Sequence, residues 1–437
     1  MAEGPFKMSV ERQKYSYFPF DDEGLRTISS RETFDTELAC CALLNEFYLT
    51  GGVRALEREA HTAYFVKGLT TAMGKDYCGY DASRVWLVYW CLQGLDLLGA
   101  LDGGKDEIPY ILERCVDFLS RCQAPSGGFG GGPQQEAHMA STYAAVMSLL
   151  IIGTPAALAT PNRLSLQAFL SRLKASGGGA AFSVTRDGEC DTRASYTALS
   201  TASALGLLTP ALTAGSADFL AACQSPEGGF GGEPGNEAHG GYTYCALAAL
   251  LILEREWGKT AGASFPSPLQ RCDLSALSRW LSRRQVDTVG GFSGRTNKLV
   301  DVCYSFWAGA SCALLVQASS SSSSSSLPAA ALAANPLPSP SHAQAYVLDV
   351  SQQPMAFMTN PQGGCRDKPA KPPDYYHTCY ALSGLSVAQW GWGTSQVMGG
   401  DSNQLLQTDP VYNIRPCRLA AAREYYASHP LPRLESE

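Results

Sequence analysis

Apolar residues recur at intervals of three and four along most of this chain, which is the spacing of helices with a buried face. Convincing strand alternation is absent. One early stretch carries Trp86 and Trp90 four positions apart, so both indoles fall on the same helical face. The pattern predicts an all-α protein. The helices that it predicts most clearly span 83–98, 142–152, 165–174, 242–253 and 274–284.

A glycine-rich turn separates these helices and recurs along the chain. Each copy leads through a polar loop to an apolar helix that begins near a tyrosine. The first glycines, at 127, 178, 228, 290 and 363, lie 51, 50, 62 and 73 residues apart, so the unit is about 50 residues long. Paired glycines suit a turn that ends a helix with positive φ. Such units are helical hairpins, which stack as an open solenoid or close into an α/α toroid.

The longest interval between turns contains a stretch of low complexity. Residues 317–344 include eight consecutive serines and then sequence rich in Ala and Pro. Such a segment cannot bury enough apolar surface to offset its ordering entropy, so we predict a disordered insertion over 317–344. The repeat resumes after it, so it does not divide two domains. We therefore expect an N-terminal arm over 1–35 and a single α/α-barrel domain over 36–437.

Composition and charge narrow the classes of function. Apolar residues make up 45% and charged residues 17% of the 437 positions, which allows a sizeable core. The net charge of −7 argues against nucleic-acid binding and is compatible with basic partners. The longest uncharged run, 139–162, is interrupted by Gly153, Pro155 and Pro161, so we predict no membrane span. Because no signal-peptide or myristoylation pattern opens the chain, we expect a cytoplasmic protein.

The fifteen cysteines are scattered through the sequence. They form no C-x-x-C pair, which argues against structural zinc fingers and thioredoxin-type redox sites. Their odd number, together with the lack of a secretory signal, favours reduced thiols, most of them small buried apolar residues.

Three residues of different type form a candidate metal site. Asp301 and Cys303 open one predicted inner helix, and His377 opens the next. In a closed ring these side chains meet at one rim, where three ligands hold Zn²⁺ and leave one position for a substrate thiol. Coordination removes the proton of that thiol and makes it a nucleophile near neutral pH. The alternative is a structural cysteine with two unrelated polar neighbours, which is the commoner origin of so short a pattern.

A second group of residues suits an anionic ligand. Arg295 and Lys298 lie just before the metal pattern, and His239 and Tyr242 belong to the preceding unit. On adjacent loops these groups can bind a diphosphate and stabilise its charge as it leaves. A solvated loop with ordinary surface cations gives the same pattern. The sequence G-x-x-x-x-G-K-[ST] is absent, which excludes a nucleotide P-loop.

Aromatic residues recur at the starts of successive inner helices. At helical spacing such residues are most often core, but the inner face of a toroid is a cavity lining. An aromatic cavity with a polar rim suits a large apolar substrate that carries a charged head. The residues are Trp86, Trp90, Tyr143, Tyr196, Tyr242, Trp307 and Tyr376.

Three long motifs stand out beside the Gly-Gly-Phe-Gly-Gly turns. They are Glu-Ala-His-Gly-Gly-Tyr-Thr-Tyr-Cys at 237–245, Gly-Arg-Thr-Asn-Lys-Leu-Val-Asp-Val-Cys-Tyr-Ser-Phe-Trp at 294–307 and Asp-Tyr-Tyr-His-Thr-Cys-Tyr at 374–380. Together they closely resemble the β subunits of protein farnesyltransferases. The resemblance runs from about Leu56 to Tyr412 and is interrupted by the serine-rich insertion.

The resemblance implies an α/α barrel that transfers farnesyl from farnesyl diphosphate to the cysteine thiol of C-terminal CaaX motifs, by zinc-activated thiolate attack. It implies that Asp301, Cys303 and His377 hold Zn²⁺ and that Asp367 is linked to Mg²⁺. It also implies a heterodimer, whose α subunit supplies a lysine to the diphosphate.

Substrate-binding residues are implied in the same way. For farnesyl diphosphate they are His239, Gly240, Gly241, Tyr242, Arg295, Lys298, Tyr304, Trp307, Arg193, Tyr196, Tyr143, Cys245 and Trp86. For the peptide they are Ser83, Trp86, Trp90, His138, Ala140 and Tyr376. Ser141 stands where the family pattern has proline, which leaves the preference for the last peptide residue open. Trp86, with Tyr380 beside it, is expected to limit the depth of the cavity.

Three alternatives remain open on the sequence alone. A geranylgeranyltransferase type I β subunit shares the fold and the zinc site, but the resemblance places a small residue where Trp86 stands. A class II terpene cyclase also uses α/α barrels, but it needs a D-x-D-D motif, which this sequence lacks. The non-enzymatic alternative is a helical-repeat scaffold that binds peptides.

Overall fold

The structure, a computed structural model, describes residues 27–103, 106–260, 267–321, 332–333, 335–352, 363–392 and 396–432. Every regular element in these ranges is a helix, and only isolated β-bridges join the turns. The prediction of an all-α protein is therefore confirmed. The helices are α2 (Ile28–Leu43), α3 (Asn45–Thr50), α4 (Arg58–Thr70), η1 (Lys75–Ser83), α5 (Arg84–Leu97), α6 (Glu107–Cys122), α7 (Met139–Ile152), α8 (Pro155–Ala159), α9 (Arg163–Ser176), α10 (Thr192–Leu205), α11 (Pro210–Thr213), α12 (Ser216–Ala222), α13 (Gly240–Thr260), η2 (Pro268–Arg271), α14 (Leu274–Ser282), α15 (Tyr304–Ser321), α17 (Pro340–Ala345), η3 (Tyr346–Ser351), α18 (Tyr375–Trp390), η5 (Asp401–Asn403) and α19 (Pro416–Ser428).

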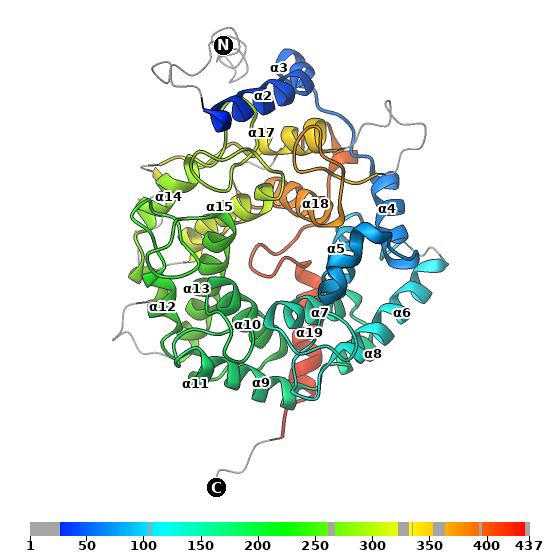
Figure 1. Ribbon diagram of the computed structural model, residues 1–437, viewed down its shortest axis with the longest axis vertical. Coiled ribbons are helices and arrows are strands. Elements are labelled where there is room, and N and C mark those ends of the chain that lie inside the picture. Colours follow the sequence, from blue (N-terminus) through cyan, green and yellow to red (C-terminus); the bar gives the residue numbers. More distant parts are fainter. Residues whose placement is uncertain are drawn as a thin grey trace.

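Six of the described helices form the inner wall of a closed ring (Figure 1). Helix α5 packs against α7, the wall continues through α10, α13 and α15 to α18, and α18 packs against α5. The units therefore close into an α/α toroid rather than an open solenoid. Inner helices have neighbours on several sides, so they are apolar around most of their circumference. In α7, every residue except Ala140 is buried.

An outer helix packs against each inner helix. The pairs are α4–α5, α6–α7, α9–α10, α12–α13, α14–α15 and α17–α18. Helix α6 shows why the outer helices differ in sequence from the inner ones. Its buried residues Ile108, Ile111, Cys115 and Leu119 recur at intervals of three and four, whereas Glu113 on another face is exposed. This single apolar stripe is what one-sided packing requires.

A glutamine that is repeated in four units connects each unit to the start of the next outer helix by a hydrogen bond. Gln123 accepts a hydrogen bond from the backbone N–H of Asn162 (3.1 Å) and donates to the carbonyl of Gly127 in its own turn (2.9 Å). Gln224 and Gln285 make the same pair of contacts. Gln352 accepts from the backbone N–H of Glu57 (2.8 Å), the residue that precedes α4. This last contact joins the final unit to the first and closes the ring.

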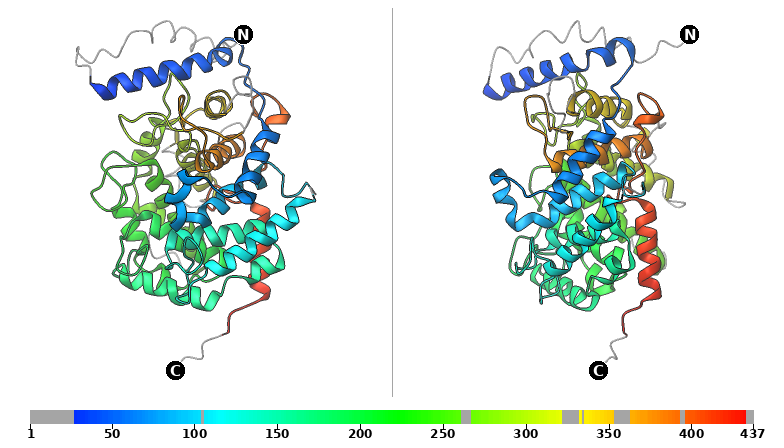
Figure 2. Two further views of the ribbon diagram at one scale, coloured as in Figure 1. Left: turned by 45° about the vertical axis from the view of Figure 1, so that its right-hand side comes forward. Right: turned by 90° about the vertical axis from the view of Figure 1, so that its right-hand side faces the viewer.

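A segment near the C-terminus, 411–413, crosses the inside of the ring, where Figure 1 shows it as the red chain entering the centre. We call this segment the floor. Four tyrosine hydroxyls of the inner helices donate hydrogen bonds to its backbone carbonyls. These bonds run from Tyr89 to Asn413 (2.9 Å), from Tyr143 to Tyr412 (2.9 Å), from Tyr196 to Val411 (2.7 Å) and from Tyr244 to Val411 (3.0 Å). Helix α19 then packs outside the ring against α7 and α10 (Figure 2).

The predicted insertion and domain boundary need correction. Helix α15 continues through 317–321, and Ser339 caps α17, which packs against α18. The prediction of disorder is therefore wrong at both ends of 317–344, while 322–331 and 334 lie outside the described residues. The boundary expected at 35 falls inside α2, and the rest of the arm, 1–26, lies outside the described residues.

Two further observations concern the cysteines and the length of the apolar helices. All fifteen cysteines are described and none forms a disulfide, and ten of them are buried, as the sequence predicted. None of the helices in the described ranges is both long and apolar enough to cross a membrane.

Candidate active site at the mouth of the barrel

The inner helices all begin at one end of the ring, which we call the mouth. Five of the loops at the mouth share one backbone conformation, which we call the frame. Four residues before each helix cap, one residue has a positive φ of 58° to 87°. Such a conformation turns the chain sharply, and it is strained for any residue except glycine. The pairs are Gln134 and His138, Asp187 and Asp191, Gly235 and His239, Asn297 and Asp301, and Ala370 and Asp374.

The cap side chains turn this frame into a set of functional groups. Each one accepts a hydrogen bond from a backbone N–H at the start of the helix that follows or, for Asp301, from the N–H of Cys303 directly before α15, and this satisfies a donor that would otherwise be unpaired. In two loops the cap is the imidazole Nδ1 of His138 or His239. In the others it is a carboxylate oxygen of Asp191, Asp301 or Asp374. The caps fix these side chains at the positive ends of helix dipoles, where anions are favoured.

The three predicted metal ligands come together at the mouth. Their ligand atoms all lie within 4.8 Å of one another, and His377 Nε2 lies 3.4 Å from Asp301 Oδ1. Asp301 and Cys303 lie directly before α15, which begins at Tyr304, and His377 lies in the first turn of the neighbouring α18. A carboxylate, a thiol and an imidazole in one cluster match the three-ligand sets of catalytic zinc sites, which leave one position open.

The titration behaviour of this cluster suits a cation. Burial raises the pKa of Cys303 well above its usual value, and the carboxylate of Asp301 raises it further. Burial lowers the pKa of His377, but hydrogen bonds to Asp301 and Asp374 outweigh this and raise it to about 10. The protein alone therefore holds a protonated thiol beside an imidazolium. A divalent cation that replaces these protons satisfies the same negative groups, so the residues present fit a zinc site.

Asp374 is a candidate site residue that the sequence analysis missed. Its Oδ2 lies 2.6 Å from His377 Nδ1, while its Oδ1 accepts the backbone N–H of His377 (2.8 Å). A carboxylate on the far nitrogen of a metal-binding histidine fixes the tautomer and leaves Nε2 free for the metal. The signal was present, because Asp374 stands three residues before His377 at a helix cap.

A second cluster beside the metal ligands suits an anion. His239 Nδ1 accepts the N–H of Gly241 (3.0 Å), so in neutral His239 the proton sits on Nε2, which lies 2.9 Å from the Tyr304 hydroxyl. Burial and the nearby Arg295 lower the pKa of His239. Arg295 pairs with Glu237 (2.9 Å), and Lys298 is exposed.

Arg193 extends the same cluster along the rim. Its Nε donates to Asp191 (2.9 Å), and its guanidinium lies 5.4 Å from the centre of the Tyr242 ring. Both residues line the large cavity described next. The rim therefore presents cations and hydroxyls directly above aromatic walls.

A cavity of about 550 Å³ opens below these groups and ends at the floor. It contains most of the predicted substrate-binding residues: Trp86, Ala140, Tyr143, Arg193, Tyr196, His239, Gly241, Tyr242, Cys245, Arg295, Tyr304, Trp307 and Tyr376. The sequence analysis did not name Thr197, Tyr244, Phe306 and Asn413, which also line it. Asn413 comes from the floor, whose position depends on long-range hydrogen bonds that no local motif encodes.

Besides the three predicted metal ligands, six predicted site residues do not line this cavity. Ser83 and His138 cap α5 and α7 at the rim, and Lys298 lies on the surface. Gly240 donates its backbone N–H to the carbonyl of Gly294 (2.8 Å). The remaining two are Trp90, whose ring meets Tyr376 edge to face, and Asp367, which pairs with Lys368 (2.5 Å).

Aromatic rings form a continuous wall around the cavity. Trp86 lies 5.9 Å from Tyr143 between ring centres, and Trp307 lies 4.3 Å from Tyr380. Trp86 remains half-buried although most of its helix is buried, because its ring faces the cavity. All of the repeated aromatic residues except Trp90 therefore line the cavity. Tyr380, which we expected beside Trp86, lines the same cavity.

Comparison with known proteins identifies the family. The model of the prenyltransferase alpha-alpha toroid domain matches residues 56–414. Protein farnesyltransferase subunit beta of Arabidopsis thaliana is 36% identical over 454 aligned positions, which cover 92% of this chain and 90% of that protein. The chain belongs to the family of protein farnesyltransferase β subunits.

Two further comparisons place the family among its neighbours. Geranylgeranyl transferase type-1 subunit beta of Arabidopsis thaliana is 30% identical, and the alignment covers 59% of this chain and 72% of that protein. The structure of Candida albicans protein geranylgeranyltransferase-I complexed with GGPP has a TM-score of 0.63 at 20% identity, and the match covers 85% of this chain and 99% of that chain. At this identity it supports the toroid fold alone.

Proposed function

We propose that this chain is the catalytic β subunit of a protein farnesyltransferase, which transfers farnesyl from farnesyl diphosphate to the cysteine thiol of a C-terminal CaaX motif. The observation that carries the proposal is the position of Asp301, Cys303 and His377 at the rim of an aromatic cavity. A metal that activates a thiol and a pocket that holds an apolar chain are the two parts that thiol prenylation needs.

Asp301, Cys303 and His377 would hold Zn²⁺, and this ion, when bound, keeps a coordinated substrate thiol in the thiolate form near neutral pH. Asp374 orients His377 through its Nδ1. The thiolate forms the new carbon–sulfur bond while the bond from the isoprenoid carbon to the diphosphate oxygen breaks. The proton of the thiol passes to solvent.

The residues of the anion cluster receive the leaving diphosphate. Nε2 of His239 and the hydroxyl of Tyr304 lie 2.9 Å apart at the rim, and Arg193 and Arg295 add positive charge beside them. Donors fixed before the reaction stabilise developing charge without reorganisation. Lys298 extends this charge to the surface. Asp367 is the carboxylate that we assign to Mg²⁺ with the diphosphate.

The isoprenoid occupies the cavity and the peptide lies above it. Tyr143, Tyr196, Tyr242, Cys245 and Trp307 give the isoprenoid an apolar wall. Ser83, Trp90, His138, Ala140 and Tyr376, near the same rim, form the peptide side.

The size of Trp86 favours farnesyl over geranylgeranyl as the donor group. Its indole and the ring of Tyr380 line the cavity above a floor that is held by four tyrosine hydrogen bonds. A longer chain would have to displace these groups, and steric exclusion discriminates more strongly than a lost contact. The alternative, a geranylgeranyltransferase type I β subunit, requires space where Trp86 stands.

A partner subunit and a cellular compartment complete the proposal. We infer a heterodimer with an α subunit that supplies a further lysine to the diphosphate, and we place the enzyme in the cytoplasm. The isolated chain is then expected to be inactive.

Co-expression with a farnesyltransferase α subunit tests the proposal. We expect one zinc per heterodimer and transfer of farnesyl to a peptide that ends in CaaX, with no transfer when its cysteine is replaced by serine. A folded heterodimer without zinc and without transfer contradicts the proposal and favours a peptide-binding scaffold. Preferred use of geranylgeranyl diphosphate favours the alternative enzyme.

A further inference from the structure

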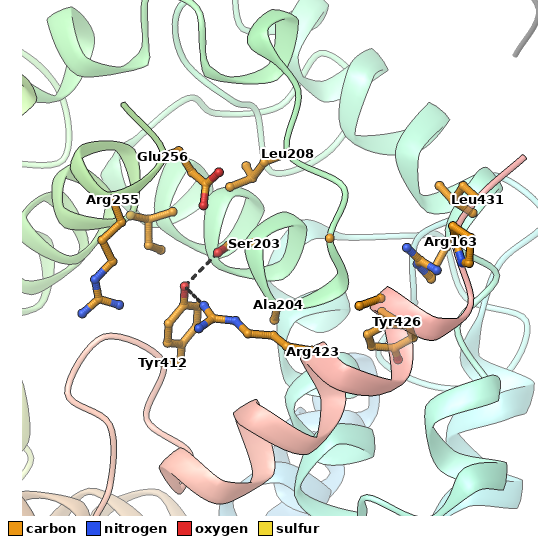
Figure 3. A pocket seen from close by; sticks show the side chains of 14 residues that line it. Arg163, Ser203, Ala204, Leu208, Arg255, Glu256, Tyr412, Arg423, Tyr426 and Leu431 are labelled. Atoms are coloured by element: carbon orange, nitrogen blue, oxygen red, sulfur yellow. Dashed lines mark hydrogen bonds between the residues drawn. The ribbon is translucent and has the colours of Figure 1, made fainter. Parts of the chain in front are cut away.

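A second cavity, of about 740 Å³, lies on the other side of the floor from the active site. We call it the basal cavity. It is formed by the ends of α10 and α13, by the start of α9 and by α19, and Figure 3 shows these helices around it. Tyr412 of the floor lines it, whereas the next residue, Asn413, lines the active-site cavity. The floor is therefore the partition between the two cavities.

Three arginines line the basal cavity, and none of them forms an ion pair with a carboxylate among the described residues, although the carboxylate of Asp409 interacts electrostatically with Arg255 and Arg423. Arg163 donates to the carbonyl of His429 (2.6 Å) and Arg255 donates to the side-chain amide oxygen of Gln317 (3.1 Å). Arg423 donates to the hydroxyl of Tyr412 (2.9 Å), as Figure 3 shows. Each guanidinium has five N–H donors, so each keeps donors for a ligand.

The cavity is positively charged although the chain is acidic. Among the described residues that line it, Glu256 is the one acidic residue, against three arginines, whereas the whole chain has a net charge of −7. The Nε atom of Arg163 is buried and has no hydrogen-bond partner in the described part of the chain. A buried donor without a partner costs free energy. A ligand oxygen that accepts a hydrogen bond from Arg163 Nε would remove this cost.

The shape and walls of the cavity point to an extended ligand. Figure 3 shows Arg255 and Arg163 on opposite sides, with Arg423 between them. Apolar side chains, among them Leu208 and Leu431, also line it. An extended ligand can reach from Arg255 on one side of the cavity to Arg163 on the other. A peptide with acidic and apolar residues in alternation satisfies several of these guanidinium groups and covers the apolar wall.

We propose that the basal cavity binds an extended acidic peptide segment of a partner protein, whose carboxylates pair with Arg163, Arg255 and Arg423. Charge complementarity favours this ligand, because carboxylates match the planar donors of guanidinium groups. A peptide segment supplies several carboxylates on one chain. The site lies apart from the metal ligands and does not depend on the proposed reaction.

Fluorescence anisotropy with the full chain, together with its α subunit where the two co-purify, tests the proposal. The probe is a labelled peptide of sequence Glu-Leu-Glu-Glu-Leu-Glu with a C-terminal amide, which has no cysteine and so cannot be prenylated. We expect saturable binding that weakens with salt, and at least about tenfold weaker binding of the peptide in which glutamine replaces glutamate.

Single variants locate the binding site. Arg255→Gln and Arg423→Gln are each expected to weaken binding of the acidic peptide about tenfold. Arg279→Gln removes an exposed arginine from α14, outside the cavity, and is expected to leave binding unchanged. Circular dichroism checks that each variant is folded. Because two cavity variants are made independently, the test remains valid if one of them does not fold.

Three results overturn the proposal. Equal binding of the acidic and glutamine peptides removes the charge argument. Loss of binding in Lys298→Gln but not in the two cavity variants assigns the peptide to the mouth. Displacement of the labelled peptide by phenyl phosphate at lower concentration than by unlabelled acidic peptide identifies the ligand as a phosphorylated small molecule.

Discussion

The mouth and the floor of the barrel are built in opposite ways. At the mouth, a backbone frame is repeated five times and the cap residue changes from loop to loop, from His239 to Asp301 to Asp374. At the floor, the inner helices repeat a tyrosine, and all of the hydroxyls hold one unrepeated segment, 411–413. Substitutions at the mouth are therefore expected to change the chemistry, whereas substitutions below it are expected to change donor choice or stability.

The largest effect is expected at the metal ligands. Cys303→Ala removes one of three ligands, and we expect zinc to be lost and farnesyl transfer to fall by about 10³-fold or more, because a bound metal contributes several kcal/mol. Metal analysis and single-turnover transfer measure this. Cys312→Ala, which removes a buried cysteine from α15, the helix that directly follows Cys303, is the control. Full zinc content in Cys303→Ala would show that the site is misassigned.

Donor choice is the next effect, and it belongs to the wall. Trp86→Thr opens the cavity, so we expect the ratio of kcat/KM for geranylgeranyl diphosphate over farnesyl diphosphate to rise by about 10²-fold. Zinc content should not change. Trp280→Thr, at a buried tryptophan outside the cavity, should reduce stability and leave this ratio unchanged. If the folded Trp86→Thr heterodimer keeps the parent ratio, Trp86 does not set chain length.

Asp374 tests how far the chemistry of the mouth depends on a cap residue. Asp374→Asn keeps the shape of the side chain but removes the charge 2.6 Å from His377, so zinc affinity should fall by about 10- to 100-fold. A competition assay with a zinc chelator measures this. Asp191→Asn alters the equivalent cap of α10 and should leave zinc affinity unchanged. Equal losses in the two variants contradict a specific role for Asp374.

A smaller effect is expected when one hydroxyl is removed from the floor. Tyr196→Phe leaves the carbonyl of Val411 with one donor fewer, and we expect the free energy of unfolding to fall by about 1–2 kcal/mol. Urea unfolding of the heterodimer measures it. Zinc content should not change. A variant with parent stability and reduced zinc would reverse the distinction between mouth and floor.

The smallest effect concerns the repeated frame itself. Ala370 has a φ of 65°, where glycine is less strained, so Ala370→Gly should stabilise the protein by about 0.5–1 kcal/mol. Thermal unfolding measures the change. Ala308→Gly, inside α15, should have the opposite sign because glycine weakens a helix interior. Destabilisation by both variants contradicts the argument from φ.

Much of the fold follows from local sequence, because each helix encodes its own periodicity and ends. The helix predicted over 83–98 is observed as Arg84–Leu97, and that predicted over 165–174 as Arg163–Ser176. Composition misled us at the insertion. Ser339 and Pro340 are a helix cap and a first-turn proline, a start signal that the prevailing Ser, Ala and Pro content concealed.

The candidate site was predictable only as far as it rests on side chains in motifs. Asp301, Cys303 and His377 stand in such motifs, and the structure brings them together. Asn413 and the other residues of the floor do not, because the tyrosines bond to backbone carbonyls, which every residue has. Because any residue can supply a backbone carbonyl, the type of the acceptor residue gives no signal for such a contact.

Closure of the ring has a consequence for how the chain folds. The contact between Glu57 and Gln352 joins residues 295 positions apart. During synthesis at about 5–20 residues per second, the first hairpin therefore waits roughly 15–60 s for its partner in the last unit. Throughout that interval the apolar flank of α5 that α18 later covers is exposed. We therefore expect the yield in a cell to depend on protection of this flank during synthesis as well as on the stability of the finished barrel.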